Sequence, residues 1–328
     1  MEHDQPYKGN RGLADLSIAV LIPCYNEEIA ITKVVNDFQA SLPVADIYVY
    51  DNNSKDKTVQ KAREAGAIVR SVTRQGKGHV VRQMFADIDA DVYLLVDGDD
   101  TYDAFVAPTM IELLMDQALD MVVGTRQTDE KEAYRSGHRT GNVVLTGVVT
   151  GIFGREFTDI LSGYRVFSKR YVKSFPVFSE GFQIETEMTV HALELAMPTG
   201  EIDTVYRSRP EGSVSKLNTY RDGFRILFMI LSLVRAERPL PFFSVIALLV
   251  TIIALILMIP ILVTYFHTGL VPRFPTAILA MGLMLIAFLS ITSGIVLDTV
   301  TKGRREMKRL FYLSTPTKYE EWLKKHNA

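Results

Sequence analysis

The chain has 328 residues, which is enough for one large α/β domain and an additional segment. Its formal net charge is −2 at pH 7, and this balance argues against a general nucleic-acid-binding protein, which would carry a strongly basic face. A single cysteine, Cys24, excludes an internal disulfide and favours a reducing compartment.

The first 205 or so residues have the pattern of an α/β domain. Residues 1–16 are polar without an apolar run, so we expect a flexible N-terminal tail and no cleavable signal peptide. Beyond them, short apolar runs alternate with helical stretches, which predicts a mostly parallel β-sheet built from βαβ units. The expected strands are 17–23, 46–51, 67–72, 91–97 and 120–125. The expected helices are 27–40, 55–65, 78–88 and 106–116, with Ser54 as a helix N-cap.

Two long apolar runs, 242–265 and 277–297, dominate the C-terminal part. Each is long enough to cross a hydrocarbon layer of about 30 Å, so residues 240–300 are expected to form two transmembrane helices. A pair of apolar core helices in a soluble protein is the alternative. Residues 218–239, just before the first run, predict a juxtamembrane amphipathic helix in the membrane interface or an ordinary domain-packing helix.

The charges that flank these runs predict an orientation in the membrane. Arginines and lysines gather before the first run and after the second, whereas the connection at 267–275 holds only Arg273. By the positive-inside rule, both termini and the α/β domain are expected in the cytoplasm, with residues 301–328 as a cytoplasmic C-terminal tail.

Polar clusters follow three of the expected strands. They are IPCYNEE (22–28), DNNSKDKT (51–58) and DGDD (97–100). Ligands of open α/β sheets collect outside the carboxyl ends of the strands, so these clusters predict a binding site. Asp51 can accept hydrogen bonds from a base or ribose, although Asp-Asn-Asn is also common in turns.

The DGDD cluster predicts a metal site. Asp97 and Asp99 repel one another unless a cation joins them, and Mg²⁺ or Mn²⁺ bridging the two phosphates of a donor would do so. A solvated acidic turn is the alternative. The chain has no Walker A loop and no G-x-G-x-x-G after a strand, which argues against P-loop hydrolases and dinucleotide enzymes.

In this order, the three clusters resemble the family 2 glycosyltransferases, which have the GT-A fold. Three further stretches resemble the polyprenyl phosphate branch of that family, which includes dolichol phosphate mannose synthase and bacterial undecaprenyl phosphate sugar transferases. They are TDILSGYRVFS (158–168), GFQIETEMTVHALE (181–194) and RPEGSVSKLNTYRDG (209–223). The resemblance implies a GT-A domain at 17–217 that transfers a hexose-type sugar from a UDP- or GDP-sugar to a polyprenyl phosphate. The reaction would be metal-dependent and inverting.

The resemblance also implies roles for individual residues. Donor binding falls to Pro23, Tyr25, Glu27, Asp51, Asp97 and Gly98, with Asp97 and Asp99 holding the metal and Asp99 and Asp159 in the catalytic centre. We expect Arg139, Ser162 and Arg165 to bind the acceptor phosphate, and Arg209, Ser215 and Lys216 to close over phosphates. For Lys77 the expected role is either a contact with donor phosphate or the first position of a helix.

These assignments have alternatives, and one departure from the family pattern affects them. Asp159 could cap a turn, the arginines could form surface salt bridges, and the basic segment could contact anionic lipid. Many relatives have a paired acid where this chain has Asp51 followed by Asn52, so nucleotide preference does not carry over.

Two other functions fit part of the sequence. A processive polysaccharide synthase would share the donor site but normally has more spans and a Gln-x-x-Arg-Trp motif, whereas the only tryptophan here is Trp322. An inactive GT-A membrane scaffold would keep the fold without turnover. Two spans are too few to move a lipid-linked sugar across a bilayer, so a separate flippase is the expected partner, and a homo-oligomer is left open.

Overall fold

The computed structural model describes residues 13–127, 157–177, 184–210 and 234–319, with isolated positions outside these ranges. The chain divides into two compact units. Unit 1 comprises Met1–Gly223 and Lys308–Ala328, and unit 2 comprises Phe224–Met307.

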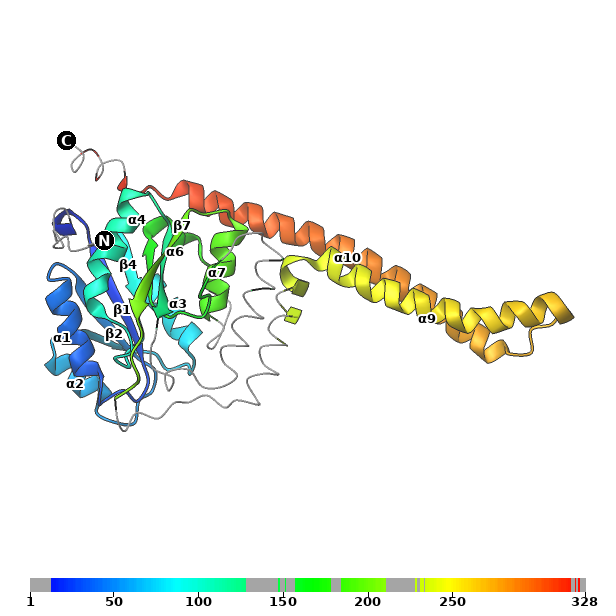
Figure 1. The fold of residues 1–328 in the computed structure, drawn as a ribbon, viewed down its shortest axis with the longest axis horizontal. Coiled ribbons are helices and arrows are strands. Elements are labelled where there is room, and N and C mark those ends of the chain that lie inside the picture. Colours follow the sequence, from blue (N-terminus) through cyan, green and yellow to red (C-terminus); the bar gives the residue numbers. More distant parts are fainter. Residues whose placement is uncertain are drawn as a thin grey trace, which may run out of the picture. The chain divides into compact units, whose positions relative to one another are not determined.

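Unit 1 is built around a mostly parallel sheet, as the sequence predicted (Figure 1). Its described strands are β1 (Ile18–Cys24), β2 (Asp46–Asp51), β3 (Ile68–Ser71), β4 (Val92–Leu95), β5 (Met121–Gln127), β6 (Arg165–Ser168) and β7 (Thr199–Val205). They lie in the order β3-β2-β1-β4-β6-β5-β7, and only β6 is antiparallel to its neighbours. Strands β6 and β7 are not among those that the sequence predicted. Because β1, β2, β4 and β5 are parallel, their carboxyl ends share one edge of the sheet.

Helices cover both faces of this sheet (Figure 1). They are α1 (Ile31–Ser41), α2 (Thr58–Glu64), α3 (Lys77–Asp87), α4 (Ala107–Asp116), α6 (Lys169–Ser174) and α7 (Ile184–Glu194), with short 3₁₀ turns η1 (Leu13–Asp15) and η2 (Ala104–Val106). On the face of α1 and α4, Phe38 packs edge-on against Tyr164 at 6.2 Å between ring centroids. On the opposite face, Phe85 of α3 packs against Tyr93, Phe167 and Phe175.

Ser54 is not the N-cap that the sequence predicted. Helix α2 begins at Thr58, and the Ser54 hydroxyl instead accepts a hydrogen bond of 2.8 Å from the backbone N–H of Asn26. The hydroxyl thus fixes the loop after β1 rather than the end of a helix.

Within the segment predicted as a C-terminal tail, the described residues from Lys308 onward belong to unit 1. Tyr319 and Trp322 belong to the hydrophobic core, and Lys308 forms a 2.6 Å ion pair with the buried carboxylate of Glu194. The Tyr312 hydroxyl donates to the carboxylate of Asp120, which is fully buried at the start of β5.

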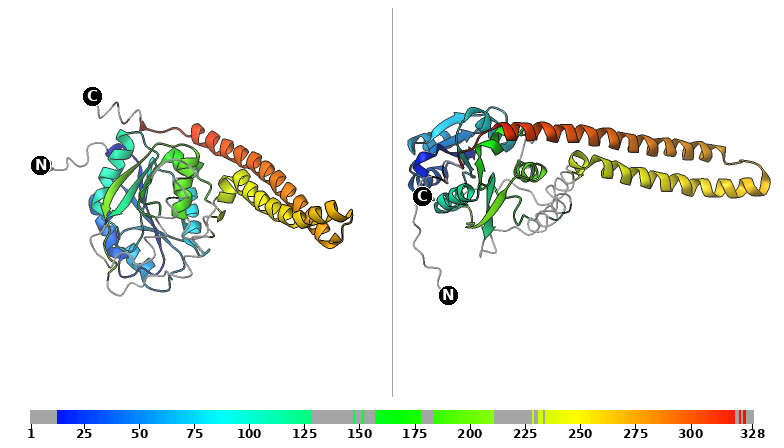
Figure 2. Two further views of the ribbon diagram at one scale, coloured as in Figure 1. Left: turned by 45° about the vertical axis from the view of Figure 1, so that its right-hand side comes forward. Right: turned by 90° about the horizontal axis from the view of Figure 1, so that it is seen from above.

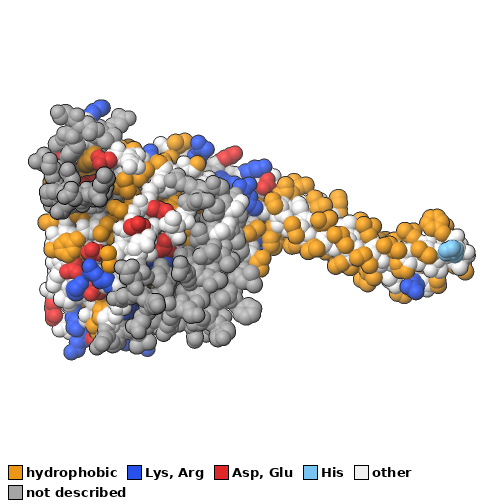
Figure 3. Space-filling view, in the orientation of Figure 1, with side chains coloured by type: hydrophobic (Ala, Val, Ile, Leu, Met, Phe, Trp, Pro, Cys, Tyr) orange, Lys and Arg blue, Asp and Glu red, His pale blue; other side chains and the backbone are white. Residues whose placement is uncertain are grey.

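Unit 2 contains two long helices that run side by side (Figures 1 and 2), α9 (Pro239–Thr268) and α10 (Phe274–Ser314), the latter ending in unit 1. Both are long and apolar enough to cross a membrane, and 17% of the most apolar window of each is buried. Hydrophobic side chains cover most of the face of these helices that Figure 3 shows. This exposure distinguishes them from the core helices of a soluble protein.

Small residues let these two helices pack closely. Ala247 and Ala254 of α9 and Ala280, Ala287 and Gly294 of α10 are buried at seven-residue intervals. A Cβ atom at Gly294 would lie 3.0 Å from Cβ of Phe243, so a larger residue there would push the helices apart. The amphipathic helix expected at 218–239 falls largely outside the described residues.

Candidate donor pocket and acceptor-side acid

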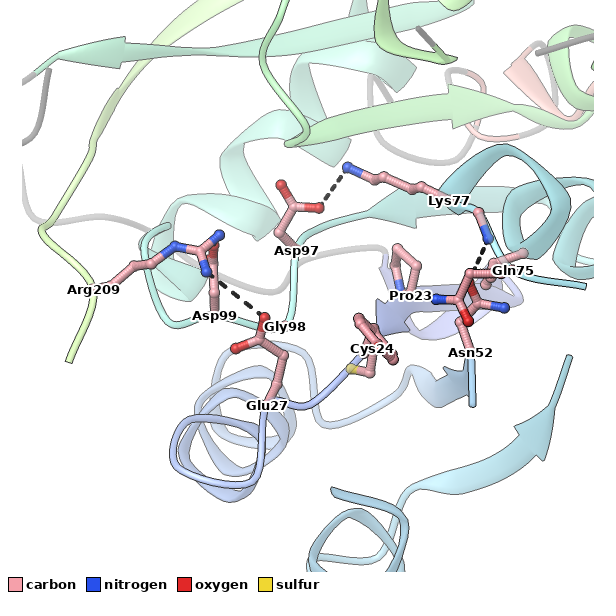
Figure 4. Close-up of a pocket in the computed structure, with 13 residues that line it drawn as sticks. Pro23, Cys24, Glu27, Asn52, Gln75, Lys77, Asp97, Gly98, Asp99 and Arg209 are labelled. Atoms are coloured by element: carbon pink, nitrogen blue, oxygen red, sulfur yellow. Dashed lines mark hydrogen bonds and ion pairs between the residues drawn. The ribbon is translucent and has the colours of Figure 1, made fainter. Parts of the chain in front are cut away.

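A pocket with a volume of about 300 Å³ lies at the carboxyl ends of β1, β2 and β4 (Figure 4). It is lined by Pro23, Cys24, Tyr25, Glu27, Asn52, Gln75, Gly76, Lys77, Val80, Asp97, Gly98, Asp99 and Arg209. All the predicted donor-binding residues are among them except Asp51, whose neighbour Asn52 lines the pocket instead. The carboxylate of Asp51 accepts hydrogen bonds from the backbone of Ser54 and is buried.

Polar side chains of the second motif hold the loop of the first. Thr58 accepts a 2.8 Å hydrogen bond from the N–H of Glu27, and Asp56 accepts one of 3.2 Å from Glu28. Asn26, in the left-handed region with φ of 55°, accepts from the N–H of Lys55. The DNNSKDKT motif therefore positions the wall of the pocket that carries Tyr25 and Glu27.

Asn52 uses both ends of its amide to shape the opposite wall. Its nitrogen donates to the carbonyls of Val72 and Arg74, and its oxygen accepts a 2.7 Å bond from the N–H of Gly76. An ionised aspartate could accept hydrogen bonds but not donate them. Asparagine at position 52, where many relatives have an acid, therefore allows this side chain to hold the connection between β3 and α3. That connection delivers Lys77 into the pocket.

Gly98 is required by a close approach of two segments. A Cβ atom at this position would lie 2.6 Å from the sulfur of Cys24. Burial first, and then the surrounding carboxylates, raise the pKa of the Cys24 thiol well above its usual value, so the thiol stays protonated. Cys24 therefore acts as an apolar packing group beneath the DGDD turn.

A buried cation links two acidic side chains on one side of the pocket. Lys77 lies 2.5 Å from Asp97 and 2.5 Å from Glu185, and its side chain is 9% exposed. Burial alone would lower the pKa of Lys77, but the charges of Asp97 and Glu185 outweigh this and raise it. Lys77 is therefore cationic, and it begins α3, which is one of the two roles expected for it.

Asp99 has a different partner on each oxygen. Oδ1 accepts a 2.6 Å hydrogen bond from Thr101, whereas Oδ2 forms a 2.6 Å ion pair with Arg209. A second nitrogen of Arg209 lies 3.8 Å from Glu27. Burial and the charge of Asp97 raise the pKa of Asp99.

The carboxylates fit a divalent metal as a partial ligand set. Among the described residues there is no cluster of three or more His, Cys, Asp or Glu side chains that could enclose an ion. Mg²⁺, however, is commonly held by one or two carboxylates together with substrate phosphates. Burial first, and then the charge of Asp97, disfavour the ionised form of Asp99 and raise its pKa, and a cation held by both carboxylates would relieve this cost.

The predicted acceptor-side acid, Asp159, lies at the same edge of the sheet near the end of β5. Both of its oxygens accept hydrogen bonds from the guanidinium of Arg126, at 2.6 and 2.8 Å. Although burial would raise the pKa of Asp159, these bonds lower it, so the group is a carboxylate at neutral pH. Arg126 also lies over the ring of Tyr206, 5.5 Å from its centroid.

The structure places Ser162 and Arg165, the residues predicted to bind acceptor phosphate, in the protein interior. Both are fully buried. The Arg165 guanidinium donates to the carbonyls of Ser162 and Ile160 and to the hydroxyl of Thr189. The Ser162 hydroxyl donates to the carbonyl of Gly124. These two side chains brace the turn that carries Asp159.

Three predicted residues lie outside the described part of the chain: Arg139, Ser215 and Lys216. Among the residues that the structure adds to the predicted site are Asn52, Arg126 and Gly163. Arg126 had a usable signal, because it follows an expected strand as the other polar clusters do. No signal in the sequence assigned Gly163 to the site, because its contact with Asp97 depends on the pairing of β6 with β4.

Comparisons with known proteins agree on one family. Residues 19–175 match the model for glycosyl transferase family 2. Glycosyltransferase AglJ of Haloferax volcanii is 35% identical over 230 residues, covering 70% of this chain and 75% of AglJ. A dolichyl-phosphate hexose transferase of the same organism is 27% identical over 221 residues, covering 67% of this chain and 95% of the relative.

Solved structures agree on the fold. Glucosyl-3-phosphoglycerate synthase from Mycobacterium tuberculosis, in complex with Mn²⁺, UDP and phosphoglyceric acid, superposes with a TM-score of 0.56 at 19% identity. The match covers 68% of this chain and 79% of the synthase.

Proposed function

Since the chain belongs to glycosyl transferase family 2, we propose that it transfers a hexose-type sugar from a UDP- or GDP-sugar to a polyprenyl phosphate. The observation that carries this proposal is the contact between Gly163 and Asp97. This contact joins the donor pocket to the turn that holds Asp159. The same chain has two helices that are long and apolar enough to cross a membrane. The dolichyl-phosphate hexose transferase among the relatives supports a lipid phosphate as acceptor.

On the donor side, the residues around DGDD hold a nucleoside diphosphate. Asp97 and Asp99 are the ligands for Mg²⁺ or Mn²⁺, which when bound stabilises the negative charge of the departing diphosphate. Lys77 holds Asp97 in place through their ion pair, and Arg209 supplies a guanidinium that can bind phosphate oxygens. Mn²⁺ and UDP in the complex of the mycobacterial neighbour support such a metal.

On the acceptor side, the chemistry calls for positive charge more than for a base. A phosphate monoester is largely ionised at pH 7, so the attacking oxygen needs no proton removed. Arg126 takes the place of Arg165 as the acceptor-binding arginine, because its side chain is 16% exposed and lies beside Asp159. Asp159 orients that guanidinium. One direct attack of phosphate on the anomeric carbon inverts its configuration.

The reaction takes place at the cytoplasmic face of the membrane in this proposal. The positive charges that flank the two spans support this orientation of both termini and unit 1 by the positive-inside rule. A separate flippase would then move the lipid-linked sugar across the bilayer.

The test is transfer of radiolabelled sugar from a panel of UDP- and GDP-sugars to undecaprenyl and dolichyl phosphate by the detergent-purified protein, with Mg²⁺ or Mn²⁺. We expect a chloroform-soluble product that Asp99→Asn abolishes. Asp100→Asn is the matched control, because Asp100 pairs with Lys33 outside the pocket and asparagine tolerates its positive φ of 58°. A water-soluble polymer would favour the polysaccharide synthase, and no transfer with any pair would favour the inactive scaffold.

A further inference from the structure

We propose that Arg209 occupies, in the donor-free enzyme, the oxygen of Asp99 that a divalent cation takes when a nucleoside diphosphate binds. Metal and nucleotide would then bind cooperatively. The diphosphate draws Arg209 away from Asp99 and so frees a metal ligand, and the metal on Asp99 frees Arg209 to bind the diphosphate. This inference rests on the proposed metal-dependent donor site.

The two oxygens of Asp99 are not equivalent, and only one is open to exchange. Oδ1 is held inside the turn by the hydroxyl and the backbone N–H of Thr101, at 2.6 and 3.3 Å. Oδ2 faces the pocket and pairs with Arg209 at 2.6 Å. The Asp99 side chain is 6% exposed, so it has little freedom to turn toward a second position. A cation entering the pocket therefore meets Oδ2 with a guanidinium already on it.

The contacts of Asp97 do not allow a cation to bridge the two carboxylates while Arg209 stays on Asp99. Its Oδ1 pairs with Lys77, and its Oδ2 lies against the backbone of Gly163, where a Cβ atom would be 2.5 Å away. Lys77 is also held by Glu185 and is 9% exposed. A divalent ion that joins Asp97 to Asp99 therefore needs Arg209 to move.

Arg209 is the cation that can leave. Its side chain is 33% exposed, and its second acidic neighbour, Glu27, is 3.8 Å away, too far for a strong hydrogen bond. A guanidinium and a divalent cation on one carboxylate oxygen repel each other strongly in a partly buried pocket. A diphosphate supplies new acceptors for the guanidinium in its preferred two-pronged geometry. Nucleotide binding thus withdraws Arg209 from Asp99 and opens the oxygen.

The experiment is a Mn²⁺ titration of the full-length protein in detergent, with free Mn²⁺ measured by electron paramagnetic resonance, without nucleotide and with UDP or GDP. Wild type is compared with Arg209→Gln and Arg207→Gln. Arg207 is a matched control, because it loses the same charge two residues away, pairs with Asp103 at 3.7 Å and does not line the pocket. Asp97→Asn identifies the site, since it should abolish the binding.

Without nucleotide, Arg209→Gln should bind Mn²⁺ about fivefold more tightly than wild type or more, and Arg207→Gln should match wild type. Nucleotide should tighten Mn²⁺ binding in wild type and Arg207→Gln but much less in Arg209→Gln. Equal or weaker Mn²⁺ binding by Arg209→Gln without nucleotide would overturn this inference alone, provided that wild type binds Mn²⁺ with nucleotide. Binding by none of the proteins, even with nucleotide, would refute the proposed donor metal site and the inference with it.

Discussion

Gly163 lies so close to Asp97 that a Cβ atom at position 163 would be 2.5 Å from Oδ2 of the carboxylate. The glycine belongs to the turn that Ser162 and Arg165 brace, and its N–H donates to the hydroxyl of Tyr102. The position of this turn thereby decides where Asp97 points, and it couples the acceptor side of the site to the donor pocket.

We predict that Gly163→Ala lowers kcat/KM by about 100-fold, because an added methyl group displaces Asp97 by a substantial part of an ångström. Gly200→Ala is the matched control. Its Cβ would meet Cδ1 of Leu119 at 2.8 Å, which is the end of a flexible side chain away from the pocket. Transfer kinetics of both variants decide the matter. A Gly163→Ala enzyme as active as Gly200→Ala would show that Asp97 tolerates the shift.

A second prediction concerns the amide of Asn52. Asn52→Asp replaces a donor to two backbone carbonyls with a carboxylate that repels them, so the connection leading to Lys77 should loosen. We expect the KM for the sugar nucleotide to rise about tenfold, with a smaller change in kcat. Asn36→Asp makes the same charge change at an exposed position of α1 that does not line the pocket, and it should have little effect. Similar KM values for the two variants would contradict this role.

The elements that the sequence predicted well are those whose signal is local. β1, β2 and β4 are apolar runs that end in polar clusters, and the clusters do meet at one edge of the sheet. β6 was not predicted because it has four residues and begins with an arginine, and β7 because its side chains are mostly half-exposed at the sheet edge. Neither carries the continuous apolar run of a strand that is covered on both faces.

The directions of the site side chains were likewise not predictable from local signals. Sequence shows that Arg165 sits in a motif but not that its side chain points into the core, because a one-residue change of register reverses the face. The pairs that organise the site join distant positions, such as Lys77 with Glu185 and Arg126 with Asp159. Only the folded sheet brings those residues together.

The stability of unit 1 should depend on pH through His191. This histidine is buried between Tyr171 and Phe175, and its Nε2 lies 3.0 Å from the Ser174 hydroxyl. Burial first, and then the charge of Lys308, lower the pKa of His191 from 6.5 to about 3. The unfolded chain therefore binds a proton below pH 6.5 that the folded chain does not bind until about pH 3.

Because the unfolded state takes up that proton first, stability present above pH 6.5 is lost as the pH falls toward 3. His191 should account for about 2 kcal/mol of the free energy of unfolding lost between pH 7 and pH 5. His191→Phe should lose correspondingly less over this interval, as measured by chemical denaturation in detergent at several pH values. Parallel pH profiles for wild type and variant would contradict the assignment.

The last prediction concerns the attachment of the chain's end to the sheet. Asp120 is a fully buried carboxylate that accepts hydrogen bonds from Ser168, Arg170 and Tyr312, the last at 2.7 Å. The Arg170 guanidinium also lies over the ring of Tyr312, 4.7 Å from its centroid. Tyr312→Phe keeps the ring and removes only the hydroxyl, so the loss should be that of one hydrogen bond to a buried charge, about 1.5 to 3 kcal/mol.

The measurement is the denaturant midpoint of the detergent-purified protein, followed by the fluorescence of its single tryptophan, Trp322, which belongs to the core of unit 1. Tyr265→Phe is the control, because its ring is 49% exposed on α9, and it should leave the midpoint unchanged. Since Asp120 immediately precedes β5, whose far end carries Arg126, Tyr312→Phe should also weaken use of the acceptor more than use of the donor. An unchanged midpoint would mean that the end of the chain is held by its apolar contacts alone.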